Sequence, residues 1–367
     1  MDSLILSILG DILGFSIFAS SMQIIPLKFT KKKYGDSYIN QALEYCDFKF
    51  VGFLSKGGIN YNISNVKYSF STLMMFATLK GLTDNKNYKK NCTDEYIKLY
   101  NKHGYKKLNE SYYANIVYLE SLKSLSSREK IEYNDKYNDS SVLSRVLPFG
   151  LLYWKKEDRS KLITEIIENI SITHKNNTCY LSGITLGLFI SFKKSGMNVN
   201  KWGYKLTEYL LSNEFDNIIK ENKLYSTEFM LEKEDYVSLW NGYLDTSFTN
   251  NKFKVRDMMD YPKYRANYFF LTFNDPFASE FVYGLTTEEC IIIAYDSLLY
   301  CDGYWEKMFI FGGLGITNNA VMGSMCGILF GIEYGMNNSI NKVVFKDEPW
   351  LKKVLTLGKN ANIMVKD

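Results

Sequence analysis

Hydrophobic and polar positions alternate with a helical period along most of the chain. Residues 66–82 place apolar side chains at 70, 73, 74, 76, 77 and 79, close to the 3.6-residue spacing of a helix. Residues 94–124 and 157–170 alternate charged and apolar positions at helical intervals, which is typical of amphipathic helices. The pattern predicts an all-α protein. Because no internal repeat or low-complexity linker interrupts it, we expect a single compact multi-helix domain over residues 1–367.

The same pattern predicts further helices and two irregular segments. Residues 3–16 are mostly apolar and include the carboxylate of Asp11, and a carboxylate inside such a run is typical of a buried core helix rather than a signal peptide or membrane span. Helices are also expected at 172–192, 204–211 and 235–244, and from a start at Thr286–Glu289. We expect irregular structure at 31–65, with a turn at Gly57–Gly58, and at 262–276.

A line of glycines distinguishes the stretch from Trp305 to Gly335. Glycines at 323, 327, 331 and 335 recur every four residues, so they would form a smooth line along a helix. Each glycine lowers the stability of a helix by about 0.8–1.0 kcal/mol relative to alanine. We expect a line of four glycines only where a second backbone packs closely against it. The sequence therefore predicts a buried central helix over 321–335, with the loop 312–320 at its start.

Composition narrows the classes of function. The chain is 46% hydrophobic and 23% charged, which is typical of a globular protein. Its net charge is +4, and its densest basic run, Lys31–Lys33, is short, so a nucleic-acid assembly is the less favoured partner. The six cysteines lack metal-binding spacing and give no sign of an oxidising compartment. With no basic leader and no uninterrupted apolar span, we expect a cytoplasmic protein without a membrane partner.

Several motifs occur in a fixed order along the chain. Gly10–Gly14 resembles the pattern GDALG at every position but the third, Ala294–Asp296 fits the start of AYDA, and Trp305 follows in place. The last helix carries Gly327, Gly331, Tyr334 and Gly335 without a gap. Together these motifs resemble the ADP-ribosylglycohydrolase family, and within it the ADP-ribosylarginine hydrolase branch. The resemblance covers residues 8–14, 66–82, 141–192 and 286–335. It implies an all-α fold and, in active members, hydrolysis of ADP-ribosyl groups with two magnesium ions.

The resemblance fails at the positions that hold magnesium in the family. In the motif [ST]DDT, Ser69 is kept, but Phe70 and Ser71 take the places of the two aspartates. In the motif GGDSDST, the two aspartate positions are Asn318 and Ala320, and Val321 replaces the following hydroxyl residue. Magnesium prefers hard oxygen ligands, mainly carboxylates. The resemblance thus implies a degenerate metal site and no metal cofactor.

The family's phosphate-cradling loop, G-x-G-A-A-M-R, is altered too. Arg145 is kept, but Asp139 and Ser141 replace the glycines, with Ser140 between them. A carboxylate repels phosphate, so the resemblance implies a degenerate ADP-ribose loop as well. His174 matches a family position, yet a structural histidine at a helix start is the favoured interpretation.

Two functional hypotheses follow. The first is a catalytically inactive family member retained as a structural or binding component, whose partner is a protein or macromolecular assembly. Phe70 would then fill the former metal volume, unless it belongs to an ordinary core elsewhere. The second is a divergent hydrolase that removes ADP-ribosyl groups, from arginine or a related acceptor, without metal. Its candidate acids are Asp11, Asp139, Glu288 and Glu289.

Overall fold

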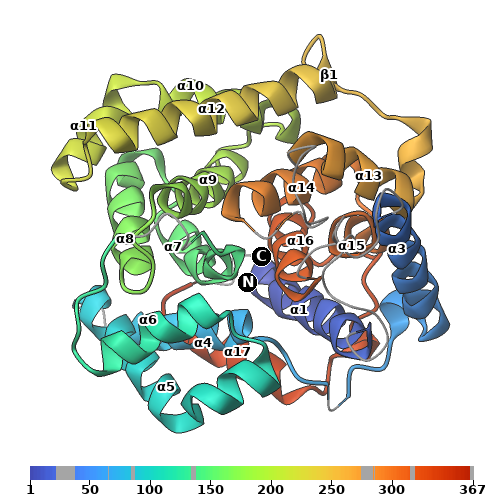
Figure 1. Ribbon diagram of the computed structural model, residues 1–367, viewed down its shortest axis with the longest axis horizontal. Coiled ribbons are helices and arrows are strands. Elements are labelled where there is room, and N and C mark those ends of the chain that lie inside the picture. Colours follow the sequence, from blue (N-terminus) through green and yellow to red (C-terminus); the bar gives the residue numbers. More distant parts are fainter. Residues whose placement is uncertain are drawn as a thin grey trace. The chain divides into compact units, whose positions relative to one another are not determined.

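The computed structural model describes residues 1–21, 38–64, 66–83, 87–133, 138–273, 284, 286–314 and 319–363; for 18–21, 38, 39, 41, 42, 258 and 270 it describes the backbone alone. Helices dominate these residues, which confirms the all-α prediction (Figure 1). The sheet found in the described part is a short antiparallel hairpin of β1 (Phe248–Thr249) and β2 (Lys252–Phe253), with Phe248 opposite Phe253. None of the described helices is both long enough and apolar enough to cross a membrane.

The chain divides into two compact units, each discontinuous in sequence. Unit 1 contains Met1, Leu73–Lys254 and Val354–Asp367, and unit 2 contains Asp2–Thr72 and Val255–Lys353. The chain passes between the units within α4 (Phe70–Gly81), after Lys254 and within α17 (Pro349–Asn360). A single domain over 1–367 stays a prediction.

Unit 2 holds both the N-terminal helix and the predicted central helix. Its helices are α1 (Asp2–Ser21), α3 (Tyr38–Ser55), α13 (Pro262–Phe273), α14 (Thr287–Tyr300), α15 (Trp305–Gly313) and α16 (Asn319–Glu333). Short 3-10 helices lie at η2 (Gly58–Asn60), η7 (Asp257–Asp260) and η8 (Lys342–Val344). The buried helix expected at 3–16, the helix start at Thr286–Glu289 and the turn at Gly57–Gly58 are confirmed.

Helices α1 and α16 lie side by side, backbone against backbone (Figure 1). A Cβ atom added to each glycine of α16 would overlap backbone atoms of α1: at Gly323 those of Gly10, at Gly327 those of Leu6, and at Gly331 those of Ser3. The predicted glycine line and its close backbone partner are thus confirmed. Gly335 lies beyond the helix with φ of +62°, where a residue without a Cβ ends a helix at low cost.

Irregular structure was expected at 31–65 and 262–276, and this expectation was wrong where these segments form helices; residues 31–37, 65 and 274–276 lie outside the described residues. Residues 262–273 form α13, and 38–55 form α3. In α13, Arg265 pairs with Asp296 of α14 at 2.5 Å, with their side chains 2% and 1% exposed. The guanidinium also lies within 5.0–5.3 Å of three aromatic ring centroids. Tertiary partners of this kind stabilise α13, and a local sequence pattern does not record them.

Unit 1 contains the remaining expected helices with shifted ends, and the stretch 94–124 is divided between two helices. Its helices are α5 (Tyr88–Tyr112), α6 (Ile116–Ser126), α7 (Leu147–Leu152), α8 (Arg159–Ser171), α9 (Asn177–Lys194), α10 (Trp202–Leu210), α11 (Asn213–Glu221) and α12 (Thr227–Ser247). Short 3-10 helices lie at η4 (Ser140–Val146), η5 (Lys156–Asp158) and η6 (Val199–Lys201). The Asn176 side chain caps α9, so His174 precedes that helix.

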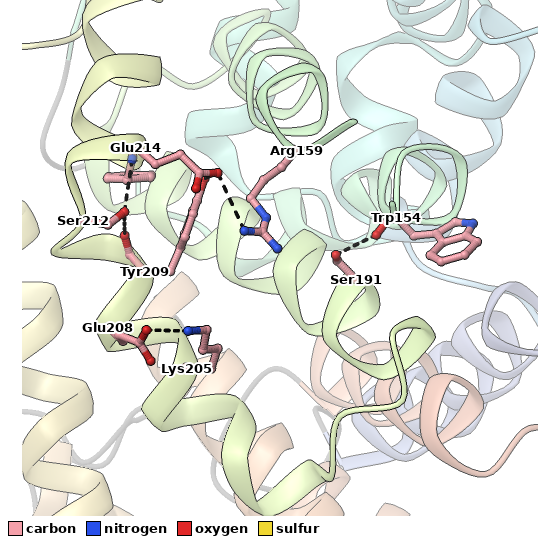
Figure 2. Close-up of polar contacts among 9 residues, drawn as sticks. Trp154, Arg159, Ser191, Lys205, Glu208, Tyr209, Ser212 and Glu214 are labelled. Atoms are coloured by element: carbon pink, nitrogen blue, oxygen red, sulfur yellow. Dashed lines mark hydrogen bonds and ion pairs between the residues drawn. The ribbon is translucent and has the colours of Figure 1, made fainter. Parts of the chain in front are cut away.

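Polar contacts connect α8 to α11 within unit 1 (Figure 2). Arg159 lies 3.7 Å from Glu214 and 4.8 Å from the centroid of the Tyr209 ring, and the Tyr209 hydroxyl donates to Glu214 at 3.1 Å. The Ser191 hydroxyl of α9 donates to the Trp154 carbonyl at 2.6 Å. Because Glu214 is exposed, its ion pair contributes little, and we expect apolar burial to stabilise this layer.

Gly327→Ala is expected to lower the free energy of unfolding by about 3 kcal/mol, because the new methyl group must push the two helix backbones apart. Urea denaturation measures the change. Gly242→Ala is the matched control, because this glycine of α12 faces open space. The same substitution should raise the free energy of unfolding there, by at most about 1 kcal/mol. Equal effects of the two substitutions would contradict the close packing of α1 and α16.

Candidate functional site

The start of α4 carries the first predicted site, formed by Ser69, Phe70 and Ser71. The Ser69 hydroxyl accepts a hydrogen bond from the Ser71 amide at 3.2 Å and so caps the helix. Asp11 of α1 accepts from the Ser69 amide at 2.8 Å, the Ser69 hydroxyl at 2.5 Å and the Thr72 hydroxyl at 2.6 Å. A carboxylate is favourable here, because the N-terminal end of a helix carries a partial positive charge.

Asp11 is suited to holding this helix start rather than to reacting with a substrate. Its side chain is fully buried, with 0% exposed. Burial raises the pKa of Asp11 to about 6, while the hydrogen bonds from Ser69 and Thr72 favour the charged form and oppose the rise. The carboxylate is therefore occupied by three donors and closed to solvent.

Phe70 occupies the first position of α4, and its ring is buried with 2% exposed. Burying one phenylalanine contributes about 2–3 kcal/mol of stability. Ala320 and Val321, in the first turn of α16, are buried as well. Asn318 lies outside the described residues, so packing of Phe70 against it stays a prediction. The basic run Lys31–Lys33, a separate feature of the sequence, also lies outside them.

One turn of α1 contacts the starts of α4 and α16, which carry described positions of the degenerate metal motifs. Asp11 contacts the start of α4, and Gly14, three residues later, lies against the start of α16. A Cβ on Gly14 would overlap the Asn319 carbonyl and lie 2.9 Å from the Ala320 nitrogen. Residues three apart share one face of a helix. Unit 2 therefore brings the two sequence motifs together through α1.

Sequence reasoning missed Lys49 and Asn319. Asn319, the first residue of α16, donates from Nδ2 to the Gly313 carbonyl at 2.6 Å and accepts at Oδ1 from Lys49 Nζ at 2.7 Å. Lys49 comes from α3 and is 3% exposed, and its Nζ lies 4.6 Å from the centroid of the Tyr45 ring. Burial lowers the pKa of Lys49 to about 8. The one signal in the sequence was a lysine between two phenylalanines, which alone predicts nothing specific.

The donor chemistry around the two helix starts differs from that of a magnesium site. The described side chains offer neutral hydroxyls, an aromatic ring and aliphatic groups, together with the Asp11 carboxylate that three donors already occupy. An ammonium group reaches Asn319. Among the residues that the structure describes, no group of three or more His, Cys, Asp or Glu side chains could hold a metal ion.

The altered ADP-ribose loop lies in unit 1, where Asp139 caps η4. Its Oδ1 accepts from the Ser141 amide at 3.0 Å and its Oδ2 from the Ser141 hydroxyl at 2.9 Å. Burial raises the pKa of Asp139, and these bonds oppose the rise. Ser140 is buried beside them. The Asp139 side chain therefore satisfies one backbone amide of its own loop, that of Ser141.

Arg145, the residue of this loop kept from the family pattern, is fully buried. Its Nη2 donates to the Asn169 and Ile170 carbonyls at 3.1 Å each, at the end of α8, and Nη1 donates to the Tyr118 hydroxyl. The guanidinium lies 5.2 and 5.3 Å from the centroids of the Tyr96 and Tyr118 rings. Helix C-termini and aromatic faces both stabilise a cation. Arg145 thus holds the end of α8.

His174 and the first turn of α14 also make local contacts. His174 Nδ1 hydrogen-bonds to the Thr173 hydroxyl at 2.8 Å, and burial together with the nearby Arg145 charge holds the pKa of His174 well below its usual value. The imidazole is therefore neutral and structural. Glu289 accepts from the Gly284 amide at 2.6 Å, while Glu288 accepts from the adjacent Thr287 hydroxyl. Like Asp11 and Asp139, these acids serve helix starts.

Asp11→Asn is expected to flatten the pH dependence of stability between about pH 4 and 6. Asp11 holds its proton more tightly in the folded than in the unfolded chain, so folding takes up a proton in this window and the parent loses stability as pH rises. A pKa raised from 3.8 to about 6 corresponds to at most about 3 kcal/mol. Chemical denaturation of both proteins across this pH range measures the difference between their free energies of unfolding. Other groups that titrate in the same way in both proteins cancel in this difference. Parallel profiles would show that Asp11 titrates at its ordinary pKa.

Arg145→Met should destabilise unit 1 by about 2–4 kcal/mol, because it leaves two buried carbonyls and a buried hydroxyl without their donor. Thermal and chemical unfolding report the loss. Lys205→Met removes a cation from an exposed pair with Glu208 and should change stability by no more than about 0.5 kcal/mol. If Arg145→Met were as neutral as this control, Arg145 would not hold the end of α8.

Comparison with known proteins supports the resemblance to this family. The family model described as ADP-ribosylglycohydrolase matches residues 1–359. The chain is 28% identical over 228 residues to putative ADP-ribosyl glycohydrolase L444 of Acanthamoeba polyphaga mimivirus, covering 61% of this chain and 44% of the relative. It is 22% identical over 220 residues to ADP-ribosylhydrolase ARH1 of Dictyostelium discoideum, covering 57% and 56%. The chain spans about half the length of these curated relatives. On the family match, this chain belongs to the ADP-ribosylglycohydrolase family.

Proposed function

We propose that this chain is a catalytically inactive member of its family, from the ADP-ribosylarginine hydrolase branch, retained as a structural or binding component. The observation that carries the proposal is the start of α4. There the buried Phe70 ring stands at a position where the family pattern has an aspartate, and Ser71 stands at the next. Neither residue supplies a charge, and the Asp11 carboxylate beside them is occupied by the helix start.

Two divalent cations do not fit this set of residues. Dications in proteins are held by several hard oxygens, with carboxylates supplying most of the opposing charge. Ser69 and Ser71 offer neutral hydroxyls, and Phe70, Ala320 and Val321 offer no side-chain oxygen. Neutral dipoles balance buried charge poorly. The proposal therefore includes no metal cofactor and no metal-assisted step.

The same reasoning makes the loop of unit 1 a poor phosphate site. The Arg145 guanidinium is engaged with the end of α8, and Asp139 places a carboxylate where the family has glycine. We therefore propose a protein or macromolecular assembly as the partner, rather than free ADP-ribose. With a net charge of +4, a nucleic-acid assembly is the less favoured form of that partner.

The competing function is hydrolysis of ADP-ribosyl groups without metal. The relatives are named as ADP-ribosyl glycohydrolase and ADP-ribosylhydrolase, which keeps this reaction as the alternative. A carboxyl group with a pKa of about 6 is suitable for general acid–base catalysis, and Asp11 has this property. However, Asp11 is closed to solvent and hydrogen-bonded to Ser69 and Thr72. The inactive function is therefore the better supported of the two.

Incubation with a peptide ADP-ribosylated on arginine tests the proposal. With millimolar magnesium and with a chelator, the protein should release no ADP-ribose above the enzyme-free rate, whereas an enzyme that cleaves this peptide serves as the positive control. Release that persists with chelator and disappears in Asp11→Asn would establish the metal-free hydrolase instead. Release that requires magnesium would overturn both accounts of the site.

A further inference from the structure

We propose that copies of this chain associate head to tail, with a basic face on α5 of one copy against an acidic face on α12 of the next. The basic face consists of Lys98, Lys102, Lys106 and Lys107, and the acidic face of Glu228, Glu234, Asp235 and Asp245, all exposed. Both helices belong to unit 1, so the proposal uses that unit alone. It goes beyond the proposed function by naming a partner, and it does not depend on whether the chain is an enzyme.

The acidic face follows one side of α12. This helix contains five acidic residues and one lysine, Lys233, which is buried and pairs with Asp216 at 2.8 Å. One exposed side of the helix presents residues at alternating intervals of three and four: Glu228, Leu231, Asp235, Ser238, Gly242 and Asp245. Among the residues that the structure describes, no carboxylate of the acidic face has an ion-pair partner. The face is therefore open to a cationic surface.

The basic face carries the opposite charge on α5, which contains six lysines and three acidic residues. Lys98 and Lys102 are one helical turn apart, and the other two lysines follow a break in the helix at Gly104, whose φ is +72°. Lys98 pairs with Glu95 at 2.7 Å. Within the described part of the chain, the other three lysines of this face have no ion-pair partner.

These charges oppose the stability of the helices that carry them. Like charges four residues apart destabilise a helix, as at Lys98 and Lys102 of α5 and at Glu228 and Glu232 of α12. Asp245 lies in the last turn of α12, where the helix end already carries a partial negative charge. Local conflicts of this kind are expected at surfaces that serve a function.

A second copy is the partner because the two faces do not meet within one chain. α5 packs on α8, α8 on α9 and α9 on α12, so other helices of unit 1 separate the two faces (Figure 1). Each copy offers one face of each sign. The contact is therefore heterologous, and association continues from copy to copy until a ring closes or an open chain forms.

Exposed apolar side chains accompany both faces. Leu231, on the acidic side of α12, is 57% exposed. Tyr113 at the end of α5 and Ile116 at the start of α6 are 37% and 61% exposed. Apolar contacts inside a polar rim are typical of protein interfaces. Because a single exposed ion pair contributes little, the association depends on several pairs together and should weaken with salt.

Sedimentation of the full chain at increasing protein concentration tests the association. The Debye length is about 30 Å at about 0.01 M salt and about 3 Å at about 1 M. We expect a mean mass that rises above that of one chain at low salt and returns to it at high salt. The mass of a single chain at every salt concentration would overturn the inference, and so would an assembly that high salt leaves unchanged.

Charge reversal decides which faces are in contact. The basic-face variant is Lys102→Glu/Lys106→Glu/Lys107→Glu, and the acidic-face variant is Glu228→Lys/Glu234→Lys/Asp235→Lys. Each variant alone should associate at least about tenfold more weakly, because every contact then joins like charges. An equimolar mixture should regain the association, since every contact between the two variants again joins opposite charges.

The matched control is Lys156→Glu/Lys194→Glu/Lys201→Glu, which changes the net charge as the basic-face variant does, at exposed positions outside α5 and α12. It should associate like the parent, and melting temperatures show that each variant is folded. A mixture that stays as single chains while both variants melt like the parent would overturn the inference. A control that loses association as fully as the basic-face variant would overturn it too. Neither result bears on hydrolysis, so the two proposals fail separately.

Discussion

The backbone of α1 packs directly against the backbone of α16, and the candidate site of unit 2 depends on this contact. Glycines remove the side chains that would otherwise separate the two helices. The close approach sets α1 beside the start of α16, while Asp11 on the same helix reaches the start of α4. Ridges of ordinary side chains keep packed helices about 8–10 Å apart, so a bulkier α16 would move these helix starts away from one another.

Buried ionisable side chains make hydrogen bonds to the elements around the altered motifs. Asp11 opposes the positive end of α4, and Arg145 opposes the negative end of α8. Lys49 donates to the side chain that begins α16. Each charge is satisfied by helix ends, hydroxyls or an amide within its own unit, which offsets part of its desolvation cost. On this account, groups of the chain itself hold these helix starts, and no dication is needed to hold them.

Local patterns predicted much of this structure, but not the partners of its buried polar groups. The spacing of Gly323, Gly327 and Gly331 predicted a close backbone contact, because a repeat of four marks one helix face wherever the partner lies. The same reasoning missed α13, whose Arg265 depends on Asp296 thirty-one residues away. It also missed Lys49, because its acceptor lies 270 residues along the chain. Position 318 is outside the described residues, and the absence of a metal site stays a proposal.

If side chains of the chain itself hold its helix starts without metal, as proposed above, the purified protein should contain almost no metal. Protein purified in metal-containing buffer and then passed through gel filtration without chelator is suitable for elemental analysis. We expect magnesium, manganese and zinc far below one equivalent per chain, with an unfolding curve that chelator treatment leaves unchanged. One or two tightly retained equivalents, whose removal lowers the melting temperature, would contradict it.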